Sequence, residues 1–90
     1  MFPSPQATGF TVYSKDDCKY CKMVKEILEP FPNVVIIDCE PFLVSQKEEF
    51  LQFIEGLAKK PHRTFPMVFH NGTFVGGFLE TFKLSDTLEE

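Results

Sequence analysis

Two cysteines three positions apart, Cys18 and Cys21, are the residues of this sequence best suited to chemistry. They form a Cys-x-x-Cys pair, and the third cysteine of the chain, Cys39, lies outside it. An odd number of cysteines without a secretion signal argues against an extracellular module held together by disulfides. In a reducing compartment the pair has two interpretations, which are thiol–disulfide exchange and one half of a metal site.

A zinc site needs more ligands than this pair supplies, because structural zinc is bound by four side chains. The other candidates are Cys39, His62 and His70, and none of them belongs to a second paired motif. His62 follows a proline and His70 precedes a turn, so we expect both imidazoles to face solvent. The spacing therefore favours redox chemistry over zinc, and we expect no metal ligands.

A helix that begins at the pair would give its two sulfurs different roles. Apolar residues recur at intervals of three and four between residues 18 and 30, which predicts an amphipathic helix ended by Pro30. Unpaired N–H groups and the helix dipole stabilise a thiolate at a helix start. Cys18 is therefore the expected nucleophile, and Cys21, one turn inside on the apolar side, the expected resolving thiol.

Charged side chains around the pair act in both directions on this thiolate. Three lysines favour it and two aspartates oppose it, namely Lys15, Lys19, Lys22, Asp16 and Asp17. Cys39 follows an apolar run, and we expect it to be a semi-buried structural thiol.

The rest of the chain predicts alternating strands and helices. β-Forming residues predict strands over 9–15 and 34–38, the second of them buried because its run is apolar. Residues 40–44 are expected to be irregular, and a Ser45–Glu48 capping box predicts a helix that Pro61 closes. Asn71-Gly72 predicts a hairpin between strands 67–70 and 73–75, which a terminal helix over 78–90 follows.

This order, β-α-β-α-β-β-α, predicts an α/β fold with one mixed sheet. A strand–helix–strand start implies a parallel pair with a right-handed crossover, and the hairpin adds antiparallel strands. We expect a four-stranded mixed sheet flanked by helices, in one domain over residues 1–90 whose residues 1–9 form an extended arm. A Cys-x-x-Cys where the first strand meets the first helix is typical of thioredoxin-like proteins.

Composition limits the partners. The net charge of −4 makes nucleic acid a poor partner, since binding to phosphates depends on clustered cations. No apolar run approaches the roughly 20 residues of a membrane-spanning helix. The first nine residues lack the features of a signal peptide, so we expect a cytoplasmic protein without membrane contact. We also expect a monomer.

Three separated motifs together resemble the dithiol glutaredoxins of the thioredoxin-like superfamily. They are Cys18-Lys19-Tyr20-Cys21, Thr64-Phe65-Pro66 and Gly76-Gly77, and the resemblance runs from about residue 10 to residue 82. It implies a glutathione-dependent thiol–disulfide oxidoreductase that reduces protein disulfides and glutathione mixed disulfides. Glutathione would be a co-substrate, no permanent cofactor is expected, and the partners would be disulfide-containing or glutathionylated proteins.

The resemblance also implies a glutathione site. Pro66 matches the family's cis-proline, beside which the backbone of Phe65 would pair with the cysteinyl part of glutathione. Gly76 and Gly77 would let the ligand approach the backbone, and the terminal helix would offer N–H groups to the γ-glutamyl carboxylate. Other matching positions are Lys15 and Arg63 near the glycine carboxylate, Tyr20 beside the tripeptide, and Glu80 after the two glycines.

Departures from the family pattern weaken parts of this expectation. The family usually has Pro where Lys19 stands, and Gln is common where this chain has His62. After the two glycines the family favours a hydroxyl or acidic residue and then Asp, whereas this chain has Phe78 and Leu79. Backbone contacts survive the last change but a side-chain contact from Leu79 does not, so we expect weaker binding of glutathione.

Two alternatives remain beside this function. One is a thioredoxin-type reductant, although thioredoxins carry a Trp where this chain has Asp17, and the chain contains no Trp. The other is a dimer that binds an iron–sulfur cluster through Cys18 and glutathione, as some glutaredoxins without Pro after the first Cys do.

Overall fold

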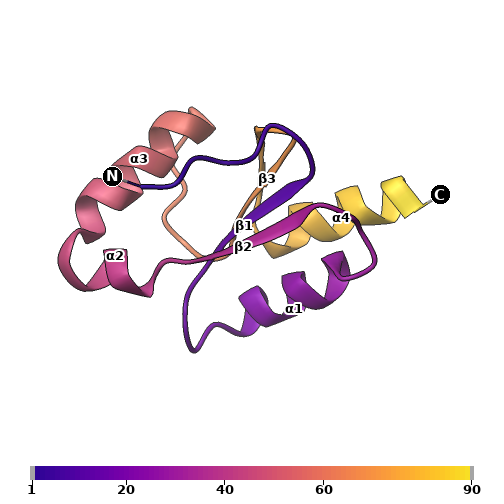
Figure 1. Ribbon diagram of the computed structural model, residues 1–90, viewed down its shortest axis with the longest axis horizontal. Helices are drawn as coiled ribbons and strands as arrows, with labels where there is room; N and C mark the ends of the chain where they lie inside the picture. The colour runs from indigo at the N-terminus through magenta and orange to yellow at the C-terminus, as the bar shows by residue number, and fades with distance from the viewer. Residues whose placement is uncertain (1, 90) are drawn as a thin grey trace.

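The computed structural model describes residues 2–89, which form a central sheet with helices on both of its faces (Figure 1). The strands are β1 (Phe10–Ser14), β2 (Val34–Asp38), β3 (Met67–His70) and β4 (Thr73–Gly76). The helices are α1 (Lys19–Leu28), α2 (Glu40–Ser45), α3 (Lys47–Ala58) and α4 (Phe78–Glu89). The four-stranded sheet and its flanking helices confirm the predicted thioredoxin-like fold.

The order of the strands, β2-β1-β3-β4, brings distant segments together. β1 pairs with β2 in parallel and with β3 antiparallel, so that Tyr13 faces Met67. The end of β1 that leads to Cys18 therefore lies beside the start of β3, which Pro66 precedes. Two segments about fifty residues apart in the sequence thus meet at one end of the sheet.

Each face of the sheet packs against its own helices, because successive side chains of a strand point to opposite faces. On one face Phe10 and Val12 pack with Val24 and Leu28 of α1. On the other face the core is richer in aromatic rings and continues into α3. Its buried members are Tyr13, Cys39, Phe50, Leu51, Ile54, Met67 and Phe69.

The N-terminal arm packs onto the aromatic face. The ring of Phe2 lies 5.2 Å from Phe42 and 5.4 Å from Phe50, measured between ring centroids. The buried hydroxyl of Tyr13 donates a hydrogen bond of 2.7 Å to the carbonyl of Pro3. The arm is therefore part of the core and not a free extension.

The ends of three segments are tied together at the end of the sheet away from Cys18. The N–H of Gly9 donates to Asn71 Oδ1, and the N–H of Asn71 donates back to the carbonyl of Gly9, both at 2.8 Å. Phe10 donates to the carbonyl of Asn33 at 3.1 Å. Asn71 and Gly72 both have positive φ, 52° and 81°, which confirms the predicted hairpin.

Three expectations about the middle of the chain are wrong. Strand 34–38 is not buried: β2 is an edge strand, and Val35 and Ile36 are 38% and 41% exposed. An apolar run indicates a strand without fixing its place in the sheet. Residues 40–45 form helix α2 and are not irregular, since a proline in the first turn of a helix gives up no hydrogen bond.

The predicted capping box is also absent. Ser45 is the last residue of α2, and α3 begins after Gln46, which makes no side-chain cap hydrogen bond. The terminal helix is confirmed over 78–89, and residue 90 lies outside the described residues.

Candidate active site

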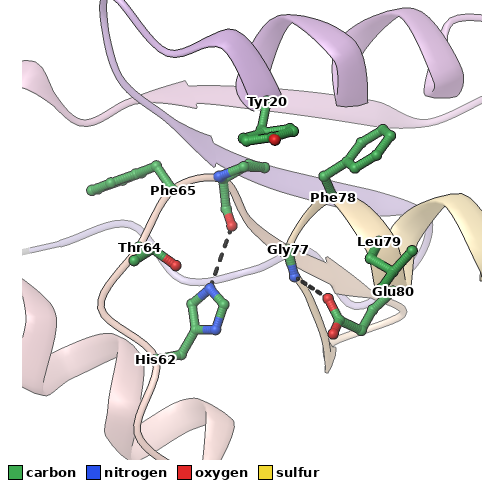
Figure 2. A pocket seen from close by; sticks show the side chains of 9 residues that line it. Tyr20, His62, Thr64, Phe65, Gly77, Phe78, Leu79 and Glu80 are labelled. Atoms are coloured by element: carbon green, nitrogen blue, oxygen red, sulfur yellow. Dashed lines mark hydrogen bonds between the residues drawn. The ribbon is translucent and has the colours of Figure 1, made fainter.

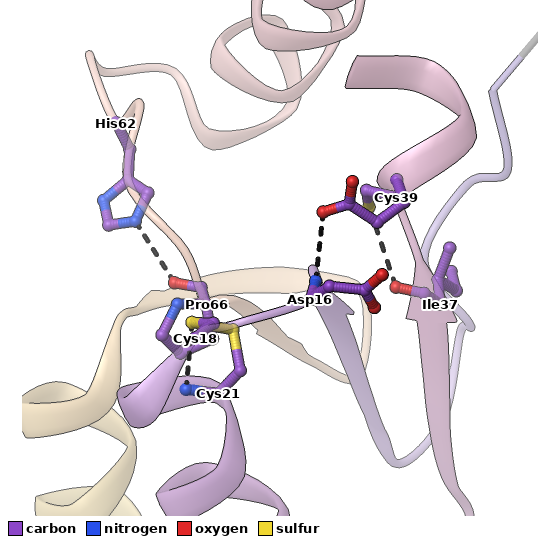
Figure 3. Close-up of a disulfide and its surroundings, with 8 residues drawn as sticks. Asp16, Cys18, Cys21, Ile37, Cys39, His62 and Pro66 are labelled. Carbon is purple, nitrogen blue, oxygen red and sulfur yellow. Dashed lines mark hydrogen bonds between the residues drawn. A yellow bond between two sulfur atoms is a disulfide. The ribbon is translucent and has the colours of Figure 1, made fainter. Parts of the chain in front are cut away.

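Cys18 occupies the N-cap position of α1, where an extended backbone conformation precedes the first helical turn. Its Sγ accepts a hydrogen bond of 3.2 Å from the N–H of Cys21 (Figure 3). The two residues form a disulfide, with their Cα atoms 5.2 Å apart. The predicted location of Cys18 at a helix start is confirmed, and a backbone donor already points at its sulfur.

The two sulfurs differ in accessibility. Cys18 is 8% exposed, whereas Cys21 is fully buried on the side of α1 that also buries Val24 and Leu28. Of the two residues, Cys18 alone has exposed surface, and the roles of nucleophile and resolving thiol stay predictions. This asymmetry agrees with the predicted roles.

Charge near the helix start favours an anion. The first turn of α1 contains no acidic residue, and it holds the exposed Lys19 and Lys22. Asp16 lies beside α2, where its N–H donates to Glu40 Oε2 at 3.1 Å. Basic side chains and free N–H groups thus lie on the helix side of Cys18.

Pro66 is among the residues that surround the disulfide (Figure 3), and the peptide bond between Phe65 and Pro66 is cis. The expected match to a cis-proline is thereby confirmed. His62 Nε2 lies 3.4 Å from the carbonyl oxygen of Pro66, so the imidazole contacts the backbone at the cis-proline.

An open groove has a volume of about 740 Å³, which is typical of a small-molecule site. Neither cysteine lines it, but Pro66, one of the residues around the disulfide (Figure 3), does. Figure 2 shows Tyr20 and His62 on opposite sides of it, with the start of α4 at one end. Its lining residues are Tyr20, His62, Thr64, Phe65, Pro66, Gly77, Phe78, Leu79 and Glu80.

Five of the eight residues assigned to glutathione line this groove: Tyr20, Phe65, Pro66, Gly77 and Glu80. Their roles toward a ligand stay predictions. Lys15 and Arg63 instead line a neighbouring hollow of about 330 Å³, which shares Thr64 and Phe65 with the groove and also holds Lys47. Lys47 was missed because its position at the start of α3 brings it there only in the fold.

Gly76 lines neither hollow. It has a φ of 136°, and a Cβ at this position would lie 2.9 Å from Cγ of Glu80. Glycine is therefore required here for the backbone conformation and for the close approach of Glu80, which is a structural role.

Glu80 turns back onto the start of its own helix. Its carboxylate accepts a hydrogen bond of 3.0 Å from the N–H of Gly77 (Figure 2). Backbone hydrogen bonds are the main cause that lowers the pKa of this carboxyl, with smaller contributions from His62 and Lys60. The helix start expected to receive a ligand carboxylate thus already holds one.

Arg63 is held by two carboxylates. It forms ion pairs with Glu48 at 2.9 Å and with Glu55 at 3.1 Å, which fix its guanidinium beside the neighbouring hollow. These contacts raise the pKa of Arg63 and lower that of Glu48. Sequence reasoning missed them because the three residues meet only when α3 packs beside the loop that follows it.

The expectation that both histidines face solvent is wrong. His62 is half-buried, with its ring 5.0 Å from Phe74 and its edge in the groove. His70 is also half-buried and lies 4.4 Å from the ring of Phe10. Within residues 2–89 no cluster of three or more His, Cys, Asp or Glu side chains has the arrangement of a metal site.

Cys39 is more deeply buried than expected, with no exposed surface. Burial is the main cause that raises the pKa of Cys39 to about 12. The charges of Asp38 and Glu40 raise it further, and a backbone hydrogen bond lowers it.

None of the described helices is long and apolar enough to span a bilayer.

Comparison with known proteins agrees with this geometry. The glutaredoxin family model matches residues 10–75. Rat mitochondrial glutaredoxin-2 is 35% identical over 75 residues, and the human protein of that name is 33% identical. Each alignment covers 81% of this chain, which spans 45% of the rat relative and 43% of the human one, or about half their length.

Solved structures give the same result. Oxidised glutaredoxin 2 of Chlamydomonas reinhardtii has a TM-score of 0.71 and 25% identity, over 90% of this chain and 74% of that one. The fold is shared with a dithiolic glutaredoxin of Trypanosoma brucei brucei, with a TM-score of 0.73, 24% identity, and coverage of 93% of this chain and 84% of that one. The buckwheat glutaredoxin–glutathione complex has a TM-score of 0.68 and 24% identity, over 93% and 74% of the two chains. On the strength of the family match and these relatives, the chain belongs to the glutaredoxin family.

Proposed function

We propose that this chain catalyses glutathione-dependent thiol–disulfide exchange, with glutathionylated and disulfide-containing proteins as substrates. The observation that carries the proposal is the geometry of Cys18. Cys18 is the more exposed residue of the pair and lies at a helix start, its sulfur accepts a backbone N–H, and Pro66 beside the disulfide lines a groove of about 740 Å³. Each feature favours an anionic sulfur that meets a disulfide partner.

The first step is an exchange that conserves electrons. The Cys18 thiolate attacks the glutathione sulfur of a mixed disulfide, the new bond joins Cys18 to glutathione, and the protein thiolate leaves. A second glutathione thiolate then attacks this bond, which releases glutathione disulfide and restores the Cys18 thiolate. In the other route Cys21 attacks Cys18, releases glutathione, and forms the disulfide seen in the structure.

The groove supports glutathione as the partner in these steps. Tyr20 and Phe65 offer flanking apolar surface, and the cis bond before Pro66 sets the backbone beside the disulfide. Lys15 and Arg63 place positive charge in the adjoining hollow. One carboxylate of the tripeptide complements these cations, whereas the helix start at Gly77 already holds the carboxylate of Glu80, so we expect the second carboxylate to add less to binding.

A coupled assay with glutathione reductase tests the proposal on a small glutathione mixed disulfide. We expect Cys18→Ser to reduce turnover to background and Cys21→Ser to retain much of it, since the first route needs one thiol. Equal loss in both variants would contradict that route. Faster reduction of the chain by thioredoxin reductase than by glutathione would favour the thioredoxin-type alternative.

Three expectations stay predictions. They are that residues 1–90 form one domain, that the chain is a monomer, and that it is cytoplasmic. The curated relatives are named as mitochondrial proteins. Size-exclusion chromatography with light scattering tests the monomer, and a brown colour in protein purified without oxygen would favour the iron–sulfur dimer.

A further inference from the structure

An exposed apolar ridge runs from the active-site helix to α4. Tyr20, Leu79 and Phe82 are 51%, 53% and 50% exposed, although all three are large hydrophobic side chains. The ring of Phe78 joins them, 5.5 Å from Tyr20 and 6.2 Å from Phe82 between centroids. Single exposed apolar residues are common on protein surfaces, whereas a contiguous group beside a reactive sulfur marks an interaction site.

The ridge is longer than the groove. Tyr20, Phe78 and Leu79 also line the groove, but Phe82 lies one helical turn beyond Phe78 and does not. A tripeptide bound in the groove would leave Phe82 uncovered. The occupant of the whole ridge must therefore be larger and must reach Cys18 at the same time, as the protein half of a mixed disulfide does.

The charges beside the ridge indicate what this partner carries. Lys19 and Lys22 are exposed one turn apart on α1, and Lys19 Nζ lies 5.9 Å from the ring of Tyr20. At the α4 end the charges are mixed, because Lys83 follows Phe82 while exposed Glu80 and Asp86 carry negative charge, Asp86 one helical turn after Phe82. Positive charge without an acidic side chain in the same helical turn is found at the Tyr20 end of the ridge, on a chain whose net charge is −4.

We propose that the ridge formed by Tyr20, Phe78, Leu79 and Phe82 docks the protein substrate, and that it selects target cysteines flanked by apolar and acidic residues. This inference rests on the proposed function, since it names the substrate class of the same site. Apolar flanking side chains pack on the rings, and acidic ones pair with the neighbouring lysines. The ridge takes no part in the chemical step.

Two glutathionylated peptides of equal length test the selectivity, one with Leu, Phe and Glu around its cysteine and one with Gly, Ser and Lys. We expect the intact chain to turn over the first with about tenfold higher kcat/KM, because partial burial of one or two apolar side chains has this effect. Phe82→Ser should lower the preference to about threefold or less. It should leave turnover of a small glutathione mixed disulfide unchanged, because Phe82 lies outside the groove.

Val44→Ser is the matched control, since Val44 is an apolar side chain of α2 that is 83% exposed and lines none of the described hollows. It should leave both the preference and the basal turnover unchanged. Equal kcat/KM for the two peptides would overturn the inference, and so would an equal effect of Phe82→Ser and Val44→Ser.

A binding measurement separates this inference from the proposed function. Fluorescein-labelled versions of both peptides, with Ser in place of the target cysteine, are titrated with the chain and followed by fluorescence anisotropy. Tighter binding of the apolar–acidic peptide, weakened by Phe82→Ser, supports the ridge even if no mixed disulfide is turned over. Turnover of the small mixed disulfide without peptide selectivity in either measurement supports the proposed function and refutes the ridge.

Discussion

Two of the three strand-to-helix junctions in the described part of the chain have a cysteine at the N-cap position, and these two are chemically opposite. Cys18 follows β1 and begins α1, and Cys39 follows β2 and begins α2. Cys18 accepts a hydrogen bond from the N–H of Cys21, whereas Cys39 makes no side-chain cap and donates instead to the carbonyl of Ile37 at 3.6 Å.

Their surroundings differ in the same direction. Charges of both signs border Cys18, with Asp17 before it and Lys19 after it, while acidic residues, Asp38 and Glu40, flank Cys39 on both sides. Cys39 also lies inside the aromatic core beside Tyr13. A helix N-terminus therefore does not by itself make a reactive thiol. Access to solvent, a backbone donor aimed at the sulfur, and the sign of the neighbouring charges determine which cysteine reacts.

The largest expected difference is in alkylation of the reduced chain. At pH 7 iodoacetamide should modify Cys18 at least about 10³-fold faster than Cys39, because the pKa of Cys39 is about 12 and that of Cys18 is expected below the ordinary value of about 8.5. Mass spectrometry of the separated peptides over time measures both rates. Comparable rates would mean that burial does not protect Cys39. A pH midpoint for Cys18 near or above 8.5 would remove its proposed activation.

Removal of the Phe2 ring, which packs against the aromatic core that contains Cys39, should destabilise the fold. Phe2→Ala removes a side chain packed against Phe42, Phe50 and Phe53, so we expect a loss of about 1–3 kcal/mol in the free energy of unfolding. Urea denaturation measures this loss, and Val44→Ala should change stability by less than about 0.5 kcal/mol. Alkylation of Cys39 should become faster in Phe2→Ala while that of Cys18 does not change. The opposite pattern would show that the arm protects the active site.

Alkaline pH should weaken the fold through the junction at Cys39. Folded Cys39 holds its proton up to a pKa of about 12, well above the ordinary value of about 8.5 for a thiol, so its contribution to stability is complete below about pH 8.5 and is lost as pH rises toward 12. The slope approaches about 1.4 kcal/mol per pH unit for one such group. Burial also raises the pKa of Tyr13, which adds a loss in the same direction.

Urea denaturation at pH 8 and at pH 10.5 tests this dependence. Between these pH values the free energy of unfolding should fall less in Cys39→Ala than in the intact chain. We expect deprotonation of Tyr13 to account for the fall that remains in Cys39→Ala. An identical pH dependence in both proteins would show that Cys39 titrates normally in the fold.

The smallest expected effect comes from reversal of one charge at the first junction. Lys19→Glu should raise the pKa of Cys18 by about 0.4–1.5 units, since an exposed charge at a helix start contributes about 0.3–1 kcal/mol and the substitution changes the charge by two. The pH profile of Cys18 alkylation measures the shift. Lys25→Glu, in the last turn of α1, is the control and should have almost no effect. Equal shifts in the two variants would indicate a general effect of net charge.

The sequence was sufficient for the parts of this fold that depend on local signals. The Asn71-Gly72 turn, the helix after Cys18 and the burial of Cys21 follow from backbone preferences and periodicity. The cis bond before Pro66 followed from a resemblance and not from local preference. The turn, the helix and the burial of Cys21 depend on short stretches of chain, and all three are confirmed, as is the cis bond.

Two errors are local: Pro41 lies in the first turn of α2, where a proline is tolerated, and the Ser45–Glu48 spacing forms no capping box. The other errors concern features that depend on packing between distant segments. The edge position of β2 follows from the strand order and not from its apolar run. The ion pairs of Arg63 and the half-buried ring of His62 need α3 and β4 to be in place first. Lys47 reaches the hollow beside the groove for the same reason.

The hydrogen bonds that tie Gly9, Asn33 and Asn71 have a consequence for the redox cycle. They fasten the starts of β1 and β2 and the end of β3 at the edge of the domain farthest along the strands from the cysteines. Local opening of a native protein begins where backbone groups are least tied. The sulfur–sulfur bond is made and broken at the opposite end of the sheet, so we expect the strand register at the tied end to be unchanged by the redox state.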